Sequence, residues 1–425
     1  MILRKLLPFI ILVFVFSCTS KTVTNPENYN AYLTTEINQD GLQENEKFWS
    51  NKIDPDKNQF PYLAKRSSAY SQIFSATGNI DYLIKAEQDL TKANEITQYN
   101  NAGYLKKLAV NYISQHRFKE ALELLKKAEE NGENLIGTKK MLFDVHLELG
   151  NYIYAETYLR EIKDTTDFDY LIRLAKWKDH KGNLDEAIVQ MEKATKVAEA
   201  SNLKSLKQWS YTNLADFYGH SGQIKKSYKH YLKALALDPN DAYAKKGIAW
   251  ITYSYENNPE EALRILNHIS TYYNAPDYDL LIADIAEYKN DDVLKLAALK
   301  RYETTVNNKF YGEMYNKYNV VLYAEDNKTM QLAINVAKRE IKNRPTPQSY
   351  DLLAWSYFKN GDINKANDII EEHVEGKTSE PDVLYHIAEI YKAAGKADKV
   401  KPLKDELVAS IYELGPTMKQ KIDQL

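Results

Sequence analysis

Histidine, cysteine and the carboxylates are the residue types most able to do chemistry in this sequence, and their spacing is unlike that of a catalytic or metal site. The eight histidines are scattered, without His-x-x-x-His spacing, and Cys18 is the only thiol, so we expect no zinc site. Neither a glycine-rich phosphate loop nor a Gly-x-Ser-x-Gly elbow occurs. Adjacent acids such as Glu129 and Glu130 are typical of a solvated helix face. We therefore expect no enzyme activity, no metal and no cofactor.

His180 and His220 are the one pair of histidines at equivalent places, since each stands two residues before a glycine that ends a helical stretch. Two interpretations stay open. They are exposed side chains beside two neighbouring turns, which is the more typical case, or they belong to a shared inner surface. Their neighbours, Asp179 and Gly219, do not decide between these interpretations.

The overall composition argues against nucleic acid as a partner. Of 425 residues, 27% are charged and 44% are hydrophobic, and the formal net charge is −3, so no strongly basic face is expected. Glycine (15) and proline (12) are sparse, as an almost entirely helical protein requires. A single cysteine permits no internal disulfide, so stability must come from packing.

The first 18 residues have the pattern of a secretory signal sequence. Two basic residues precede an apolar run, residues 6–16, which is shorter than the roughly 20 residues of a membrane-spanning helix. The run ends in the tetrad VFSC, which closes at Cys18 and resembles the lipobox of bacterial lipoproteins. This resemblance implies removal of residues 1–17, acylation of Cys18 and attachment to a membrane. The alternative is an ordinary cleaved signal peptide in which the cysteine is incidental.

The residues after Cys18 bear on location and on the tether. Thr19 and Ser20 replace the aspartate that favours inner-membrane retention. By the same resemblance we expect an outer-membrane lipoprotein of a Gram-negative, Bacteroidetes-like bacterium, with its body facing the periplasm. Residues 18–59 are polar, with Pro26 and other helix breakers, and this composition predicts a lipid anchor followed by a polar tether.

Residues 208–240 contain the clearest copy of a repeated pattern. Tyr211 and Leu214 belong to an apolar stripe at helical spacing, Gly222 ends the first helix, and Pro239 ends the second. Position by position, this stretch resembles a tetratricopeptide repeat, a 34-residue helix–turn–helix unit.

The same pattern recurs along most of the chain. The predicted turns between paired helices lie at Gly78, His116, Gly150, Gly182, Gly222, Asn257, near Asn290, and at Lys328, Gly361 and Gly395. Five residues after a turn, the family places a small residue where its helices cross, and this sequence has Ala121, Ala155, Ala187, Ser227, Ala262, Ala333 and Ala366. The resemblance implies an all-α fold: a right-handed superhelical α-solenoid of about ten helix pairs over residues 60–414, followed by a C-terminal cap or tail, residues 415–425. The units within residues 277–345 are degenerate and rich in tyrosine.

In this family the first helices line a concave groove that holds peptides or protein segments. By register, the inner wall is expected to carry Lys140, Asp144, Ile172, Lys176, His180, Trp209, Thr212, Asp216, His220, Ile251, Tyr255, Asp351, Trp355, Phe358 and Tyr385. The aromatic members are candidate anchors for a partner, or they pack against the next repeat. A groove that clamps a terminal carboxylate is not expected, because Val110 and Asp144 stand where that type of groove has asparagine.

Two classes of function follow from these observations. The first is a non-catalytic scaffold, tethered to a membrane, that holds a protein partner of the cell envelope in its groove; an assembly factor for envelope machinery is a special case of it. The second is a glycan-binding accessory lipoprotein for carbohydrate uptake, because tyrosines are dense between Tyr253 and Tyr323 and sugars stack on aromatic faces. Tyr255 and Trp355 are the residues that would test it.

Overall fold

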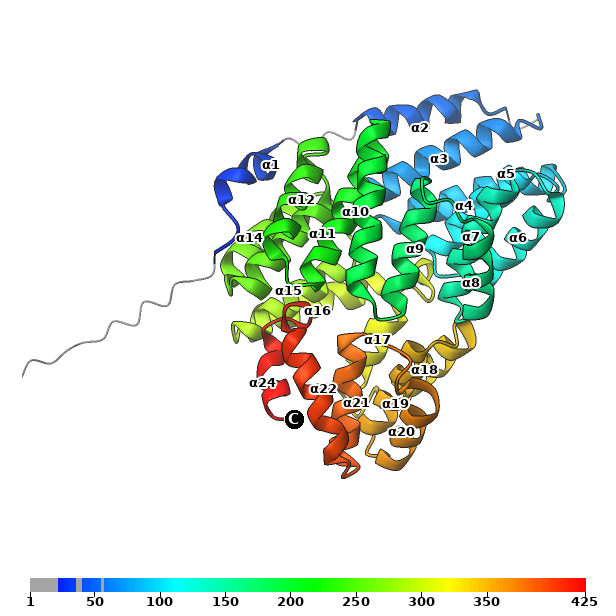
Figure 1. Ribbon diagram of the computed structural model, residues 1–425. Helices are drawn as coiled ribbons and strands as arrows, with labels where there is room; N and C mark the ends of the chain where they lie inside the picture. The colour runs from blue at the N-terminus through cyan, green and yellow to red at the C-terminus, as the bar shows by residue number, and fades with distance from the viewer. Residues whose placement is uncertain (1–21, 36–39, 55–56) are drawn as a thin grey trace, which may run out of the picture.

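The computed structural model describes residues 22–35, 40–54 and 57–425, and this part of the chain is all-α. Ten helix pairs follow one another and form a solenoid (Figure 1). The pairs are α3 (Phe60–Thr77) with α4 (Ile80–Ile96), α5 (Ala102–Ser114) with α6 (Phe118–Asn131), α7 (Leu135–Glu148) with α8 (Tyr152–Glu161), α9 (Phe168–His180) with α10 (Leu184–Ser201), α11 (Lys204–His220) with α12 (Ile224–Leu237), α13 (Ala242–Trp250) with α14 (Pro259–Ile269), α15 (Asp277–Tyr288) with α16 (Asp292–Val306), α17 (Asn316–Tyr323) with α18 (Met330–Asn343), α19 (Pro347–Lys359) with α20 (Ile363–Ile369), and α21 (Pro381–Ala393) with α22 (Ala397–Ala409). The expected signal sequence, residues 1–17, and Cys18 lie outside the described residues.

The turns between paired helices lie where the sequence predicts them. Nine of the ten predicted turn residues have a positive φ, the left-handed conformation that ends a helix: Gly78, His116, Gly150, Gly182, Gly222, Asn257, Asn290, Gly361 and Gly395. Lys328 is the exception, because a longer non-helical turn joins α17 to α18. The fold prediction is therefore confirmed at the level of the individual helix pair.

The small residues five positions after the turns allow the paired helices to cross closely. Ala121, Ala155, Ala187, Ser227, Ala262, Ala333 and Ala366 are each 0% exposed. The two larger residues at this position, Leu83 and Val400, are also buried. Each helix pair thus covers the apolar face of its neighbour, which is how stability accumulates in a solenoid.

The sixth pair departs from the regular repeat at a π-helical turn, η2 (Ile251–Tyr255), which directly continues α13. A π turn accommodates one more residue than the α-helix would. The sequence shows this insertion as spacing: Asn257 follows Gly222 by 35 positions, one more than the 34 of the repeat. Relative to the regular 34-residue register, the residues of α13 before the π turn are therefore shifted by one position from the residues after it. A second π turn, η4 (Ile370–Val374), follows α20.

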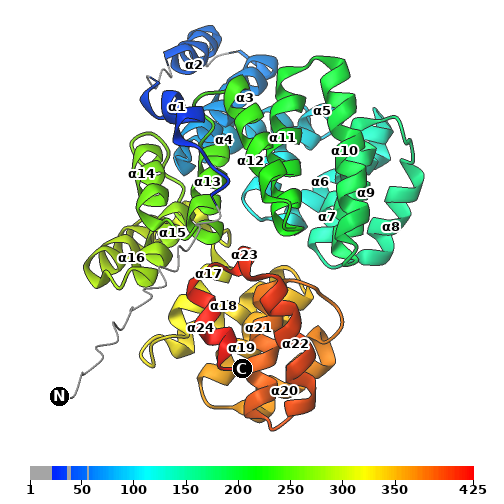
Figure 2. The ribbon, with the colours of Figure 1, turned by 60° about the vertical axis from the view of Figure 1, so that its left-hand side comes forward.

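The solenoid curves so far that its C-terminal pairs pack against the turns of its N-terminal pairs. Figure 2 shows the pairs from α17 onward lying below the earlier ones. Asn343 Nδ2 donates to the carbonyl oxygen of His116 (3.3 Å), and Arg344 Nη1 lies 3.3 Å from Glu148 Oε2. These contacts join residues about 200 positions apart in the sequence, and they turn an open groove into a more enclosed interior.

Gly78 marks a close approach between the first pair and the segment before α15. Its φ is +68°, and a Cβ built on it would lie 2.8 Å from the backbone nitrogen of Ala275. The neighbouring backbone nitrogen of Asn274 donates to the carbonyl oxygen of Thr77 (2.8 Å). Glycine is therefore required here both by conformation and by the close backbone contact.

The first described segment packs on the solenoid, although its polar composition predicts a tether. The backbone nitrogens of Val23 and Thr24 both donate to Glu256 Oε1, at 2.6 Å each. Tyr29 is buried, and its hydroxyl donates to Glu261 Oε1 (2.7 Å). The segment contains η1 (Pro26–Asn28) and α1 (Asn30–Thr34). Its polar groups thus bind carboxylates of the sixth pair.

Short helices cover both ends of the solenoid. α2 (Asp40–Lys52) lies against α3, where the hydroxyl of Tyr70 donates to Glu46 Oε1 (3.0 Å). α23 (Ile411–Leu414) and α24 (Thr417–Asp423) follow the last pair, and Thr417 Oγ1 donates to Asp284 Oδ1 on α15 (2.8 Å). Among the helices of the described residues, none has both the length and the apolar character that a bilayer span requires.

Candidate binding surface

The inner helices of the third and fourth pairs carry charged residues that are already paired with one another. Lys140 Nζ lies 2.7 Å from Asp167 Oδ1, and Arg173 Nη2 lies 2.6 Å from Asp144 Oδ2. Burial raises the pKa of Asp144, while the adjacent guanidinium of Arg173 opposes that effect. The charges of Lys140 and Asp144, which both lie on α7, are thus neutralised within the protein.

Lys176 and His180, on α9, also have partners within the protein. Lys176 Nζ lies 2.8 Å from Glu148 Oε1, and the other oxygen of Glu148 faces Arg344 from the C-terminal half. The ring of His180 lies 4.4 Å from that of Tyr152, and burial lowers the pKa of His180. Lys176 and Glu148 therefore form part of a contact that joins the third and fourth pairs to Arg344 after α18, whereas His180 packs within these two pairs.

The expected site residues of the ninth and tenth pairs form a packed aromatic cluster. Trp355 is 6% exposed and stacks on His386, with ring centroids 4.0 Å apart. His386 Nδ1 lies 2.8 Å from Oδ2 of the buried Asp351, and burial raises the pKa of Asp351. Phe358 and Tyr385 pack around Trp355, at centroid distances of 5.2 and 6.3 Å. Of the two interpretations left open for Trp355, the structure therefore supports packing against the next repeat, and Asp351, a candidate for contact with a partner, is buried by the same repeat.

α11 carries the most exposed of the expected aromatic anchors. Trp209 is 41% exposed, and its ring meets that of Phe168 edge-on at 5.9 Å. Thr212, one turn later, is buried, and its hydroxyl donates to the carbonyl oxygen of Trp209 (3.0 Å). The expected exposure of Thr212 is thus also corrected, because its side chain bonds to its own helix.

The π turn decides which residues of α13 face inward. Ile251 is fully buried and Tyr255 packs against the central apolar core, so these two do not form the inner wall as the regular register predicts. Tyr243 does: it is 51% exposed, and its hydroxyl donates to Asp216 Oδ2 on α11 (2.6 Å). Lys246 faces the next inner helix. Sequence reasoning missed Tyr243, and the one-residue excess between Gly222 and Asn257 was the signal that could have revealed it.

The chain's own C-terminal segment occupies the other end of this inner wall. Trp250 Nε1 and Ser254 Oγ both donate to the carbonyl oxygen of Tyr412, at 3.1 and 2.6 Å. A Cβ on Gly219 would lie 2.9 Å from the ring of Tyr412. Trp250 of α13 and Ser254 of η2 therefore bind the main chain of this segment, and Gly219 of α11 leaves room for the ring of Tyr412.

His220 lies beside this segment, and not beside His180. Its Nδ1 is 3.7 Å from Glu413 Oε2, and burial lowers the pKa of His220. Burial raises the pKa of Glu413 to about 7, with a further contribution from the nearby carboxylates Glu380 and Asp179. Within residues 22–35, 40–54 and 57–425, no group of three or more His, Cys, Asp and Glu side chains is arranged to hold a metal ion.

A pocket of about 300 Å³ opens at the amino-terminal end of α13. It is lined by Leu42, Ser75, Ala76, Asp238, Asn240, Asp241, Ala242, Tyr243, Tyr272 and Tyr273. Tyrosine rings and carboxylates thus share one hollow, and Tyr273 is in contact with Tyr278 at a ring distance of 5.1 Å. Trp209 on α11 and Tyr243 on α13, which also lines this pocket, are called the aromatic strip below.

The charges along the inner wall do not balance. The cations Arg173, Lys176, Lys246 and Lys317 are each paired with a carboxylate. Six carboxylates of the wall and its rim, in contrast, form no ion pair with a lysine or arginine of the described chain: Asp179, Asp216, Asp241, Asp284, Glu380 and Glu413. Burial raises the pKa of each of the six. The inner wall and its rim therefore carry carboxylates that no lysine or arginine of the described residues neutralises.

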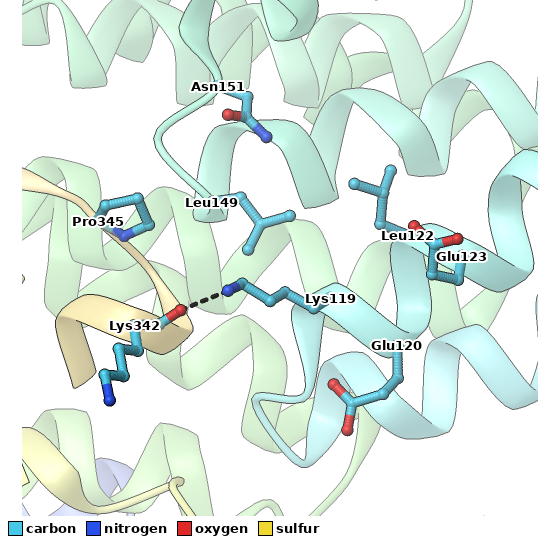
Figure 3. Close-up of a pocket in the computed structure, with 8 residues that line it drawn as sticks. All are labelled: Lys119, Glu120, Leu122, Glu123, Leu149, Asn151, Lys342 and Pro345. Carbon is cyan, nitrogen blue, oxygen red and sulfur yellow. Dashed lines mark hydrogen bonds between the residues drawn. The ribbon is translucent and has the colours of Figure 1, made fainter. Parts of the chain in front are cut away.

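A larger cavity, of about 630 Å³, lies at the seam between the two halves (Figure 3). Its lining comprises Lys119, Glu120, Leu122, Glu123, Leu149, Asn151, Lys342 and Pro345. Lys119 Nζ donates to the carbonyl oxygen of Lys342 (2.5 Å), and Glu120 accepts from Arg117 (2.9 Å). Two of its charged side chains, Lys119 and Glu120, are thus bonded to neighbours within the protein.

Comparison with known proteins identifies one repeat of the chain. Residues 210–241 match the tetratricopeptide repeat family, and no curated protein matches the sequence. Among solved structures, the chain is similar to human IFIT1 bound to m7Gppp-AAAA (15% identity, TM-score 0.48, covering 78% of this chain and 75% of that one). It is also similar to a tetratricopeptide repeat protein from Parabacteroides merdae (17% identity, TM-score 0.40, covering 60% and 95%). These similarities carry no inference about a ligand. The chain is an all-α solenoid whose fifth helix pair is a tetratricopeptide repeat.

Proposed function

We propose that this protein is a non-catalytic scaffold that binds an extended, basic segment of a partner protein along the aromatic strip of α11 and α13. The observation that carries this proposal is the exposure of Trp209 on α11 and Tyr243 on α13, two consecutive inner helices, whereas Trp355 on α19 is packed. Exposed aromatic side chains on a concave surface are typical anchors of protein interfaces.

The charge of the wall argues for a basic partner. Asp216 and Asp241 lie next to the exposed rings and accept hydrogen bonds from neutral groups only. A lysine or arginine side chain that enters here gains a carboxylate partner and an aromatic face at once. An acidic segment would add charge to carboxylates whose pKa burial already raises, so the wall discriminates against it.

The way the chain binds its own C-terminal segment supports a peptide as the ligand. Trp250 and Ser254 hold the main-chain carbonyl of Tyr412, so this wall has side chains that recognise backbone groups. The aromatic strip lies on the same inner helices and remains open. A partner segment would thus extend along α11 and α13 beside residues 410–415.

We also propose that the scaffold is attached to a membrane through an acylated Cys18, as an outer-membrane lipoprotein facing the periplasm. The support is the lipobox-like tetrad that ends at Cys18. Several acyl chains would hold the solenoid stably at a lipid surface.

Site-specific photocrosslinking in living cells tests the protein-binding proposal. A photoreactive phenylalanine replaces Tyr243, and a matched control replaces Val189, which is 45% exposed on the outer helix α10. We expect a discrete protein adduct from position 243 and none from position 189. The absence of an adduct at 243, or identical adducts at both positions, would contradict the proposal.

A glycan-binding accessory role is the second candidate, because tyrosine rings and carboxylates line the same 300 Å³ pocket. Rings stack on sugar faces and carboxylates accept from sugar hydroxyls. Tyr243 now replaces Tyr255 and Trp355 as the residue to test, since those two are packed. Binding of an oligosaccharide on a glycan array, lost on Tyr243→Ala, would favour this role; an array without signal excludes it.

A further inference from the structure

We infer that the turn edge of the sixth and seventh helix pairs faces a lipid surface, and that Val293 and Leu296 on α16 contact the lipid. The inference rests on the proposed acylation of Cys18. It goes beyond that proposal because it assigns the solenoid one orientation at the membrane. A flexible tether would permit many orientations.

The first step is the short distance between the acylated residue and the solenoid. Thr22, the first described residue, is four positions after Cys18, and four residues span at most about 14 Å when fully extended. The next two residues, Val23 and Thr24, are fixed by their backbone nitrogens to Glu256, and Thr24 Oγ1 donates to the same carboxylate (2.8 Å). The solenoid is therefore held close to the membrane at this point.

The second step places this point at the edge formed by two neighbouring turns. Glu256 directly follows the π turn η2, in the turn before α14. Lys289, in the turn before α16, donates to Glu260 Oε2 at the start of α14 (2.5 Å). Figures 1 and 2 show the first described residues beside α14, with α15 and α16 next in the array.

The third step is the apolar surface at the start of α16. Val293 is 82% exposed and Leu296 is 66% exposed. They lie in the first two turns of the helix, directly after the turn that contains Lys289. Apolar side chains in water gain free energy when they enter a lipid surface, and at this edge the anchored chain would bring the surface to them.

A second exposed apolar pair serves as the matched control. Ile153 is 81% exposed and Tyr154 is 62% exposed at the start of α8. They follow a turn as Val293 does, but both views place α8 on the opposite side of the molecule from the first described residues. Exposure alone therefore predicts equal lipid contact for the two pairs, whereas the inferred orientation predicts contact for Val293 and Leu296 and none for Ile153 and Tyr154.

Photocrosslinking to phospholipid tests the orientation directly. The full-length, acylated protein carries a photoreactive phenylalanine at position 293 or 153 and is reconstituted in vesicles of phosphatidylethanolamine and phosphatidylglycerol. We expect at least tenfold more phospholipid adduct from position 293, detected by the mass of the labelled peptide. Equal labelling at the two positions, or only protein adducts at 293, would overturn the inference.

Two further variants separate this inference from the anchor on which it rests. Incorporation of labelled palmitate into the wild-type chain, and its loss in Cys18→Ser, reports acylation alone; a chain without palmitate overturns both proposals. Glu256→Ala removes the carboxylate that fixes Val23 and Thr24, and we expect it to lower lipid labelling at position 293 severalfold with palmitate unchanged. Undiminished labelling in this variant would show that the contact of Glu256 with Val23 and Thr24 does not set the orientation.

Discussion

Trp209 on α11 and Trp355 on α19 are both predicted to lie on the inner wall, yet one is exposed and the other is buried. Trp355 is covered because the next inner helix, α21, supplies His386 as a stacking partner and Tyr385 beside it. The next inner helix after α11 supplies Tyr243, which turns its hydroxyl to Asp216 and leaves its ring half exposed. The residue contributed by the following repeat, more than the position on the wall, decides whether an aromatic side chain packs or remains available.

The electrostatics of the two regions differ in the same way. At α19 the buried Asp351 has His386 as a partner. At α11 and α13 the carboxylates Asp216 and Asp241 have only neutral partners. The ninth and tenth pairs thus bury their aromatic rings and pair their carboxylate, whereas the fifth and sixth pairs leave Trp209 and Tyr243 partly exposed beside carboxylates with neutral partners.

The largest effect expected from this contrast is on stability. Trp355→Ala should lower the free energy of unfolding by about 3–5 kcal/mol, because it opens a cavity in a packed cluster. Trp209→Ala should cost under about 1 kcal/mol, as is usual for a partly exposed side chain. Urea unfolding followed by circular dichroism measures both. Equal losses would mean that the two aromatics do not differ in role.

A pH-dependent effect is expected at the C-terminal segment that packs on α11. Burial raises the pKa of Glu413 from 4.5 to about 7, so the folded state favours the protonated form. The resulting penalty is absent below pH 4.5, grows as the pH rises toward 7, and is complete above it, at a maximum of about 3 kcal/mol. The melting temperature should therefore fall between pH 5 and 8, and Glu413→Gln should reduce this fall. A fall of the same size in the variant would exclude Glu413 as its source.

A smaller loss of stability is expected when a methyl group is added beneath the aromatic strip. A Cβ on Gly247 would lie 2.2–2.5 Å from the ring of Tyr231, a ring that is buried between α12 and α13. Gly247→Ala should cost about 1–3 kcal/mol through overpacking. Gly41→Ala is the control, since a Cβ there meets nothing within 4 Å. The unfolding midpoints of the two variants are compared. Equal midpoints for Gly247→Ala and Gly41→Ala would contradict the packing of α13 against Tyr231.

The smallest effect concerns the hydroxyl of Tyr243. Tyr243→Phe removes the hydrogen bond to Asp216 but keeps the ring, and we expect a loss of about 0.5–1.5 kcal/mol in unfolding free energy. If the ring is the binding element, affinity for a partner should be preserved in this variant and lost in Tyr243→Ala. A loss of affinity in both variants would assign binding to the hydroxyl.

The sequence was sufficient to predict the helix pairs, because their signals are local. Glycine or asparagine at the turns and alanine at the crossings report on contacts within one repeat, and Gly150 and Ala155 behave as predicted. The exposure of the inner wall was predicted less well, because it depends on the next repeat and on the closure of the solenoid. Trp355 is covered by a residue 31 positions later, and no local pattern reveals such a partner.

Tyr243 and Tyr255 show a second reason why the inner wall was predicted less well than the helix pairs. A regular 34-residue register places Tyr255 on the inner wall, whereas the π turn Ile251–Tyr255 moves Tyr243 there. The inserted residue was visible as spacing, but spacing alone does not say where along the helix pair the extra residue is accommodated. The polar segment before α2 is a similar case, since its composition did not reveal that Glu256 and Glu261 would bind it.

The central claim is that the strip of α11 and α13 binds a basic segment, and fluorescence anisotropy tests it most directly. Two labelled peptides of equal length, one rich in lysine and arginine and one rich in glutamate, are titrated with the full chain. The account predicts at least tenfold tighter binding of the basic peptide, and at least a tenfold loss of that binding in the double variant Trp209→Ala/Tyr243→Ala, with Val189→Ala unaffected. Equal affinity for the two peptides, or undiminished binding by the double variant, would contradict it.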